Sequence, residues 1–197
     1  SKLENIGCNA LFLPEVQEIY PRGLAKKKIV TNFRNILCDK FRPGHFDGVT
    51  TVVDFFLNMI KPTNSYFGEK DFQQVKIIQD LVKINHHNIK IIQCPSVRDK
   101  MGMSLSSRNY KFSNDQLKIF NVLGNKIKEH INLLTQNEIN NLDQLKIELL
   151  QNNINKIDYL EIRNENNLEI TKNYSKARLF IALYIGDIRI IDNFKLY

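Results

Sequence analysis

Long apolar runs, a basic-then-apolar leader and paired cysteines are all missing from this sequence of 197 residues. No stretch approaches the roughly 20 uninterrupted apolar residues that a membrane-spanning helix needs. The opening residues 1–5 also lack the pattern of a secretory signal. Because both features are absent, the sequence favours a cytoplasmic protein without a membrane partner.

Cysteines and histidines are too few and too scattered to build a recognisable metal or disulfide framework. The three cysteines, Cys8, Cys38 and Cys94, are widely spaced and odd in number, which is not typical of a disulfide scaffold or a CxxC site. His86 and His87 are adjacent, but no third ligand lies at metal spacing from them, so they predict a solvated helix end. No metal site is predicted.

The overall composition is that of a globular protein, with 43% hydrophobic and 25% charged residues. The length suits one good-sized domain or two small ones. The net charge is +7, but Lys26–Lys28 is the only tight basic run. No alternation of Arg with aromatic residues suggests a base-stacking platform. We therefore expect a solvated surface with a few phosphate-binding residues, and no nucleic-acid partner.

Strand and helix signals alternate through the first half of the chain. Residues 1–7 predict the end of a helix, and three- and four-residue apolar spacing predicts two further helices, over 46–60 and 71–85. Apolar runs predict strands at 10–13, 28–31, 65–67 and 89–94. Strands alternating with helices over short connections are typical of a parallel sheet in an α/β fold.

The pattern changes near Arg98, which predicts a second unit. Residues 99–113 are polar and predict a mobile loop. Beyond them the patterns predict helices over 114–134 and 142–154, then strands over 157–162, 177–185 and 188–194. We therefore predict an α/β domain over residues 1–98 and a smaller α+β domain over residues 99–197.

The segment Arg42–Val49 reads RPGHFDGV and precedes the first full helix. Pro and Gly shape a turn, and Asp47 is predicted to cap the helix. Arg42 and His45 flank the positive end of that helix, which favours an anion site. The alternative is an ordinary turn and cap with incidental charges.

The segment Phe67–Gln74 reads FGEKDFQQ and joins a predicted strand to the next helix. Ligands of parallel α/β sheets bind at this end of the strands. Gly68 would let a ligand approach the backbone, and Lys70 offers a point charge for phosphate. Asp71 can accept hydrogen bonds from ribose hydroxyls, and Gln74 lies one turn into the helix, facing the same mouth.

The segment Met103–Asn109 reads MSLSSRN and lies in the predicted loop. Two hydroxyls, Ser106 and Ser107, followed by Arg108 suit a triphosphate, because a guanidinium binds two phosphate oxygens at once. Loop closure would neutralise charge on departing pyrophosphate. The alternative is a polar linker or a phosphorylation site. The methionines of this loop are predicted to serve in packing.

Taken together, these segments resemble the pantoate–β-alanine ligases, the pantothenate synthetase family. They resemble, in order, its RPGHFxGV, FGEKDxQQ and LSSRN segments; the last is the family's counterpart of the KMSKS loop of class I aminoacyl-tRNA synthetases. The early residues 12–14 and 18–21, FLP and EIYP, also fit.

The resemblance implies a Rossmann-like nucleotidyltransferase sheet, followed by a small lid domain, and a two-step reaction. Pantoate attacks the α-phosphate of ATP, with Mg²⁺ present, to give pantoyl adenylate and pyrophosphate. The amine of β-alanine then attacks the acyl carbon and releases pantothenate and AMP. Family analogy also suggests a homodimer. Positioning and charge neutralisation account for most of this chemistry, so no general base is named.

The resemblance also assigns roles to individual residues. Carried over position by position, the catalytic residues that hold the phosphates are Lys70, Ser106, Ser107 and Arg108. The rest of the ATP site comprises Gly68 and Asp71 at the ribose, the Val97 backbone at the adenine, and Leu105. Pantoate is held by Gln74 and the walls Val52 and Val53, with Arg42 and His45 supporting the pantoate and β-alanine end.

Three positions depart from the family pattern, and one part of it is missing. Cys38, Asp39 and Met101 stand where the family usually has Glu, Gly and Asp. Family members begin with a strand and an HxGH-type motif that stabilises the phosphates, and with a Gln that holds pantoate; neither is in this sequence. We therefore expect residues 1–197 alone to be a poor catalyst with uncovered apolar surface.

Two rival hypotheses remain open from the sequence. Another nucleotidyltransferase, such as a cytidylyltransferase, would share the phosphate-binding loop but not the GEKDxQQ segment. A non-enzymatic remnant that binds nucleotide or RNA through its basic surface would show salt-sensitive binding with no effect of pantoate on ATP.

Overall fold

A computed structural model describes residues 2–21, 23, 30–86, 88–136 and 142–197. Two sheets organise these residues: a parallel pair, β1 (Asn64–Gly68) and β2 (Lys90–Cys94), and an antiparallel sheet in the order β3 (Lys156–Asn164), β4 (Ala177–Ile185) and β5 (Ile188–Lys195). The helices are α1 (Lys2–Asn5), α2 (Val16–Ile19), α3 (Leu37–Phe41), α4 (His45–Ile60), α5 (Phe72–Asn85), α6 (Asn114–Thr135) and α7 (Asp143–Gln151), with two short 3₁₀ turns, η1 (Glu69–Asp71) and η2 (Ser107–Lys111). The chain is therefore a mixed α/β protein, as predicted.

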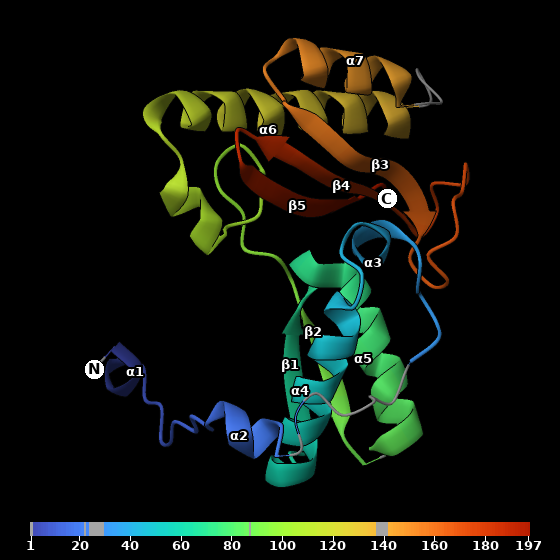
Figure 1. Ribbon diagram of the computed structural model, residues 1–197. Helices are drawn as coiled ribbons and strands as arrows, with labels where there is room; N and C mark the ends of the chain where they lie inside the picture. The colour runs from blue at the N-terminus through green and yellow to red at the C-terminus, as the bar shows by residue number, and fades with distance from the viewer. Residues whose placement is uncertain (1, 22, 24–29, 87, 137–141) are drawn as a thin grey trace.

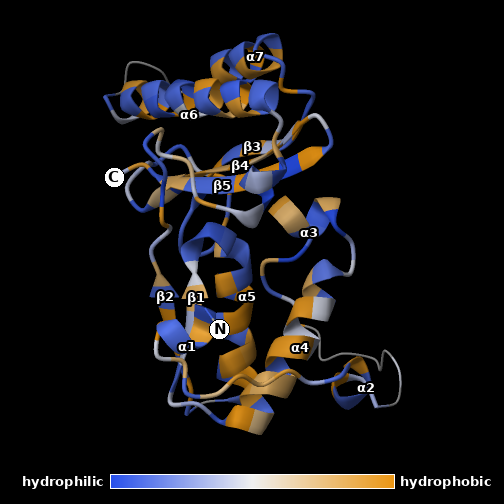
Figure 2. Ribbon diagram, turned by 90° about the vertical axis from the view of Figure 1, so that its left-hand side faces the viewer, coloured by the Kyte–Doolittle hydropathy of each residue, from blue (hydrophilic) through white to orange (hydrophobic). Residues whose placement is uncertain are grey.

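The parallel pair and its crossover helix follow the sequence prediction closely. β1 and β2 pair in register from Asn64 with Lys90 to Gly68 with Cys94, and α5 connects them. α4 packs beside α5, and hydrophobic residues recur along both helices (Figure 2). α4 ends where Lys61 takes a left-handed backbone angle, with Pro62 following it. This arrangement brings the start of α5 to the carboxyl end of β1.

The antiparallel sheet lies between two layers of helices (Figure 1). Successive residues of its central strand β4 point to opposite faces. Leu179, Ile181 and Leu183 pack in a core with residues of α6 and α7, whereas Phe180 and Ala182 pack in a second core with residues of α3 and α5. The sheet is therefore buried on both faces, which explains why β4 reads as a nearly continuous apolar run.

The predicted boundary at residues 98 and 99 falls just after β2, but the two halves share a core. The second core joins Cys38 and Phe72 of the first half to Tyr159 and Phe180 of the second. The division into two domains stays a prediction, and residues from both halves can meet at one site.

The strand predicted at residues 10–13 is wrong. These residues have no regular secondary structure and lie on an arm with α1 and α2 that extends away from the two sheets (Figure 1). Leu11 and Leu13 are 61% and 77% exposed, although Phe12 makes an edge contact with Phe56 of α4. A strand needs a hydrogen-bonding neighbour, and in the described residues β1 and β2 pair only with each other. Half of the strand predicted at 28–31 lies outside the described residues, and residues 30 and 31 have no regular secondary structure.

Two local predictions also need correction. Gly44, with φ of 76°, caps α4, and Asp47 lies inside the first turn, where its carboxylate accepts a hydrogen bond from Arg34. His86 is buried rather than solvated, and its Nε2 lies 2.8 Å from a carboxylate oxygen of Asp54 on α4. His87, the other half of that prediction, lies outside the described residues. Within the part of the chain that the structure covers, no helix combines the length and apolar character needed to cross a bilayer.

Candidate active site

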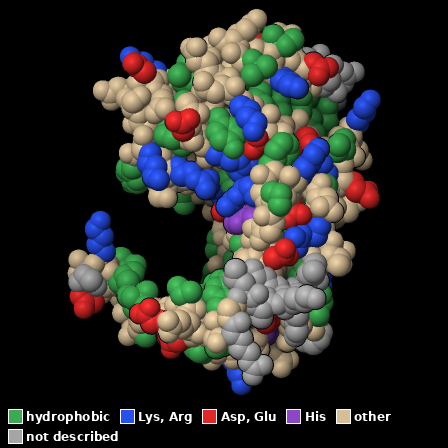
Figure 3. All heavy atoms as spheres, viewed as in Figure 1, with side chains coloured by type: hydrophobic (Ala, Val, Ile, Leu, Met, Phe, Trp, Pro, Cys, Tyr) green, Lys and Arg blue, Asp and Glu red, His purple; other side chains and the backbone are tan. Residues whose placement is uncertain are grey.

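Three adjoining hollows run along the junction of the two sheets. The central one is lined by residues of α3, α4, η1, α5 and strands β3 to β5. It shares Lys70 with a second hollow and shares His45 and Gln74 with a third, which is wider than the other two. Figure 3 shows Lys and Arg side chains gathered at this junction, with a histidine among them. The hollows therefore form one continuous site with a basic wall.

The second hollow brings together most of the residues predicted to hold phosphates. Lys70 of η1 lines it together with Ser106 and Arg108 of the loop. The Ser106 hydroxyl accepts a hydrogen bond from the Arg108 amide at 3.3 Å, and the Arg108 guanidinium donates to the carbonyl oxygen of Arg189 at 3.3 Å. Ser107 is exposed beside them but does not line the hollow. Two cationic side chains and a hydroxyl thus meet at one hollow, and groups of these types bind anionic oxygens.

The other residues predicted to contact ATP are more dispersed. Asp71 lines the central hollow from the end of η1. Gly68 ends β1, and a Cβ there would meet no atom within 4 Å, so a ligand has room beside its backbone. Val97 and Leu105 line none of the three hollows; they are exposed, and the Leu105 amide donates to the Val97 carbonyl at 2.8 Å. The loop is thereby folded back on itself.

The third hollow contains the residues predicted to hold pantoate. Val52 and Val53 of α4 and Gln74 of α5 line it, together with Tyr20 and Val49. It therefore combines an apolar wall with one amide able to donate and accept hydrogen bonds. The tyrosine comes from the early EIYP segment, for which no role was predicted.

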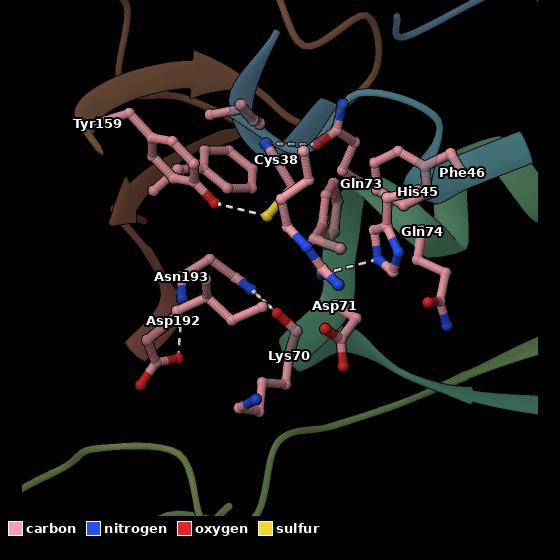
Figure 4. A pocket seen from close by; sticks show the side chains of 15 residues that line it. Cys38, His45, Phe46, Lys70, Asp71, Gln73, Gln74, Tyr159, Asp192 and Asn193 are labelled. Carbon is pink, nitrogen blue, oxygen red and sulfur yellow. Dashed lines mark hydrogen bonds between the residues drawn. The ribbon is translucent and has the colours of Figure 1, made fainter. Parts of the chain in front are cut away.

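Arg42 and His45 lie between the phosphate side and the apolar side of the site. A guanidinium nitrogen of Arg42 is 2.8 Å from Nε2 of His45 (Figure 4). An arginine can only donate, so Nε2 accepts and the proton of the neutral imidazole sits on Nδ1. Burial and the nearby Arg42 charge lower the pKa of His45 below its usual value of 6.5. His45 is therefore neutral at pH 7 and presents an N–H donor.

The turn that contains Lys70 is held by buried partners that the sequence did not reveal. The Glu69 carboxylate receives hydrogen bonds from Gln93 at 2.8 Å and from Arg178 at 3.2 Å. Burial opposes its charge, but these hydrogen bonds prevail and lower the pKa of Glu69. Arg178 is 1% exposed and lies over the Phe72 ring. The available signal was a single arginine within the apolar run of β4, which indicates a buried ion pair.

A second polar cluster lines the central hollow opposite His45 (Figure 4). The Cys38 sulfur lies 3.1 Å from the Tyr159 hydroxyl and 3.8 Å from a guanidinium nitrogen of Arg189. Another nitrogen of the same guanidinium donates to the Asp158 carboxylate at 2.8 Å. Burial raises the pKa of Tyr159 well above its usual value. Tyr159 is thus a neutral hydroxyl that joins the two halves of the chain.

Comparison with known proteins places this chain in a family. A sequence profile described as pantoate-beta-alanine ligase matches residues 1–195. The chain belongs to the pantoate–β-alanine ligase family. Among its relatives, the pantothenate synthetase of Thermodesulfovibrio yellowstonii is 38% identical over 98% of this chain and 70% of its own length. That of Francisella tularensis subsp. novicida is 40% identical over 98% of this chain and 66% of its own length.

Solved structures of the family share the fold. A pantothenate synthetase from Thermus thermophilus superposes with a TM-score of 0.88 at 30% identity, over 100% of this chain and 72% of that one. The pantoate-beta-alanine ligase of Francisella tularensis, crystallised with beta-gamma ATP and beta-alanine, gives a TM-score of 0.82 at 36% identity, over 99% of this chain and 67% of that one. This chain therefore spans about two thirds to 72% of the length of the relatives it matches.

Proposed function

We propose that this chain forms part of an enzyme that condenses pantoate with β-alanine at the expense of ATP, through pantoyl adenylate, releasing AMP and pyrophosphate. Its family is named for the ligation of these two acids, and a family member has been crystallised with an ATP analogue and β-alanine. The parallel pair with α4 and α5 would be the remainder of a Rossmann-like nucleotidyltransferase sheet, and residues 99–197 the lid domain. Family analogy adds a homodimer.

The observation that supports this proposal best is the order of side chains along the three joined hollows. Lys70 and Arg108 occupy one end, and Gln74 with the apolar wall of Val52 and Val53 occupies the other. A substrate with a branched apolar body would lie against the valines while its carboxylate pointed toward the basic end. That placement brings a carboxylate nucleophile to a phosphate held by cations.

At the phosphate end, the residues would act by neutralising charge. When the pantoate carboxylate oxygen attacks the α-phosphorus, the bond to the bridging oxygen breaks and negative charge grows on pyrophosphate. Lys70 and Arg108 would stabilise that charge, and the hydroxyls of Ser106 and Ser107 would donate to it. Gly68, Asp71, Val97 and Leu105 would hold the nucleoside part.

At the acid end, the residues would act mainly by positioning. Gln74 can donate to and accept from the hydroxyl groups of pantoate. Arg42 and the Nδ1 proton of neutral His45 can orient the carboxyl group, and later the β-alanine that attacks it. The attack of the amine on the acyl carbon expels AMP and completes the amide.

Mg²⁺ enters this proposal as the counter-ion of the nucleotide. Among the residues that the structure describes, no three or more His, Cys, Asp or Glu side chains are grouped so that they could hold a metal ion. Mg²⁺ in nucleotide sites is bound largely by phosphate oxygens and water.

Pantoate-dependent exchange of labelled pyrophosphate into ATP tests the proposal, because it reports adenylate formation alone. The assay compares the longest natural polypeptide that contains these residues with residues 1–197 alone. We expect exchange in the longer form and little in residues 1–197. Absence of exchange in both would overturn the proposed function, and salt-sensitive RNA binding in its place would favour a binding role.

A further inference from the structure

Two neighbouring residues of β5, Asp192 and Asn193, hydrogen-bond to two different segments that line the second hollow, the turn at Lys70 and the loop at Ser104. They are 4% and 1% exposed, and both line the central hollow. Successive side chains of a strand point to opposite sides, so the pair reaches in two directions from one piece of backbone. Neither residue has a role in the function proposed above.

Asn193 holds the turn from which Lys70 extends. Its amide nitrogen donates to the carbonyl oxygen of Lys70 at 3.0 Å (Figure 4). The same nitrogen donates to the carbonyl oxygen of Glu69 at 2.8 Å. Its amide oxygen accepts from Arg178 at 2.6 Å. The two carbonyls flank the Lys70 α-carbon, so the asparagine fixes the backbone that aims the Lys70 ammonium. The ion pair of Glu69 with Arg178 pulls the same turn toward the sheet.

Asp192 holds the loop that leads to Arg108. Its carboxylate accepts from the Ser104 amide at 2.7 Å and from the Ser104 hydroxyl at 2.6 Å. It also pairs with Arg98 at 3.2 Å, and Arg98 in turn donates to the Asn193 carbonyl at 2.7 Å. Ser104 lines the same hollow as Arg108. The aspartate thus anchors the loop just before its phosphate-binding residues.

We propose that Asp192 and Asn193 are positioning residues that hold Lys70 and the Ser106–Arg108 segment at the separation that adenylate formation needs. This inference rests on the proposed function. Lys70 and Arg108 come from elements far apart in the sequence, yet must contact one triphosphate. Because a misplacement of about 1 Å can lower a rate about a hundredfold, a rigid shared anchor has a direct catalytic consequence.

The substitution Asn193→Asp isolates the proposed role. An aspartate keeps an oxygen facing Arg178, but replaces the amide donors with an acceptor that faces two carbonyl oxygens. In the longest natural polypeptide, we expect kcat/KM for ATP in pyrophosphate exchange to fall at least about tenfold. The KM for pantoate should stay within about twofold, because Gln74 and the valines are untouched. Asp192→Asn should also lower kcat/KM for ATP and leave the KM for pantoate unchanged, because it loosens the loop that carries Arg108.

Glu165→Gln is the matched control. Glu165 pairs with Arg178 from its other side and makes no hydrogen bond to the Lys70 turn. Glu165→Gln removes the ion pair with Arg178 but leaves the Lys70 turn held. It should therefore lower the unfolding midpoint, while kcat/KM for ATP stays within about twofold of wild type. A merely structural network would instead make this control and Asn193→Asp alike.

The outcomes separate the two proposals. Wild-type protein without exchange refutes the proposed function. With wild-type exchange present, the positioning role is refuted if Asn193→Asp keeps kcat/KM for ATP within about twofold, or if the ATP and pantoate parameters decline together with the unfolding midpoint. Should Asn193→Asp not fold, Glu69→Gln loosens the same turn through a partly exposed side chain. Normal ATP kinetics in both Glu69→Gln and Asp192→Asn would then overturn the proposal.

Discussion

Gln73 and Gln74 are adjacent on α5, yet their side chains lie in different surroundings. Gln73 is 5% exposed; its amide oxygen accepts from the Cys38 amide at 2.9 Å, and its nitrogen donates to the Phe33 and Ile36 carbonyls. Gln74 makes none of these contacts; both glutamines line the central hollow, but only Gln74 also lines the third. The second glutamine of the QQ motif therefore extends to the third hollow, and the first fastens the segment before α3 to α5.

We predict that alanine at these two positions separates binding from stability. Gln74→Ala removes an amide from the hollow and should raise the KM for pantoate about tenfold, with little change in the free energy of unfolding. Gln73→Ala leaves a buried Cys38 amide without its acceptor and should lower the free energy of unfolding by about 2 kcal/mol. Pyrophosphate exchange measures the KM for pantoate, and urea unfolding measures the free energy of unfolding. If Gln74→Ala affected only ATP, its assignment to pantoate would be wrong.

The pair Arg42 and His45 should make the site sensitive to mild acid. Burial and the Arg42 charge hold the folded pKa of His45 below 6.5, so as the pH falls the unfolded chain takes up this proton first. The contribution of His45 to stability is therefore complete above about pH 6.5 and is lost as the pH falls through the folded pKa. NMR titration of the His45 ring should show the lowered pKa directly.

Arg42→Gln should raise the pKa of His45 part of the way back toward 6.5, because burial remains. Lys40→Gln is the control: it removes a positive charge from the same segment, but Lys40 is not among the groups that chiefly set the pKa of His45. Its titration curve should match the wild type. A wild-type pKa for His45 at or above 6.5 would contradict the assignment of a neutral imidazole.

Lys70 and Arg108 should each be needed for adenylate formation. Lys70→Ala and Arg108→Ala remove charges that face one hollow, and each should cut pyrophosphate exchange at least about tenfold in the longest natural polypeptide. Lys118→Ala, which removes an exposed lysine paired on α6 with Asp115, is the control and should leave exchange unchanged. Near-normal exchange in both site variants would exclude these residues from the site.

Most helices and strands were predictable because local periodicity decides them. The apolar spacing of 46–60 and 71–85 gave α4 and α5, and the three late apolar runs gave β3, β4 and β5. The apolar run 10–13 failed because a strand depends on a neighbour that periodicity does not encode. The capping role expected of Asp47 failed because Gly44 adopts the left-handed angle that starts the helix one turn earlier.

The candidate site was predictable only where it lies in short motifs. Lys70, Ser106, Arg108 and Gln74 stand in segments whose residue types suggest phosphate or substrate binding, and the structure brings them to one set of hollows. Asp192 and Asn193 were not found, because a DN pair within a strand has no pattern of its own. Their importance comes from the fold, which lays β5 against the turn after β1.

The close contact of α6 with the loop before Ser104 gives a last prediction. A Cβ added at Gly124 would lie 2.9 Å from the Met101 Cβ and 3.0 Å from its carbonyl oxygen. On an exposed helix face, replacing Gly by Ala raises the free energy of unfolding by about 1 kcal/mol. In a tightly packed place, the added methyl group instead lowers it by about 1–3 kcal/mol. Gly124→Ala should therefore lower the free energy of unfolding, whereas Asn125→Ala, on the exposed face of the same turn, should raise it by about 0.5 kcal/mol. Urea unfolding of both variants decides the matter: if Gly124→Ala were as stabilising as Asn125→Ala, the loop would not pack against α6 as described.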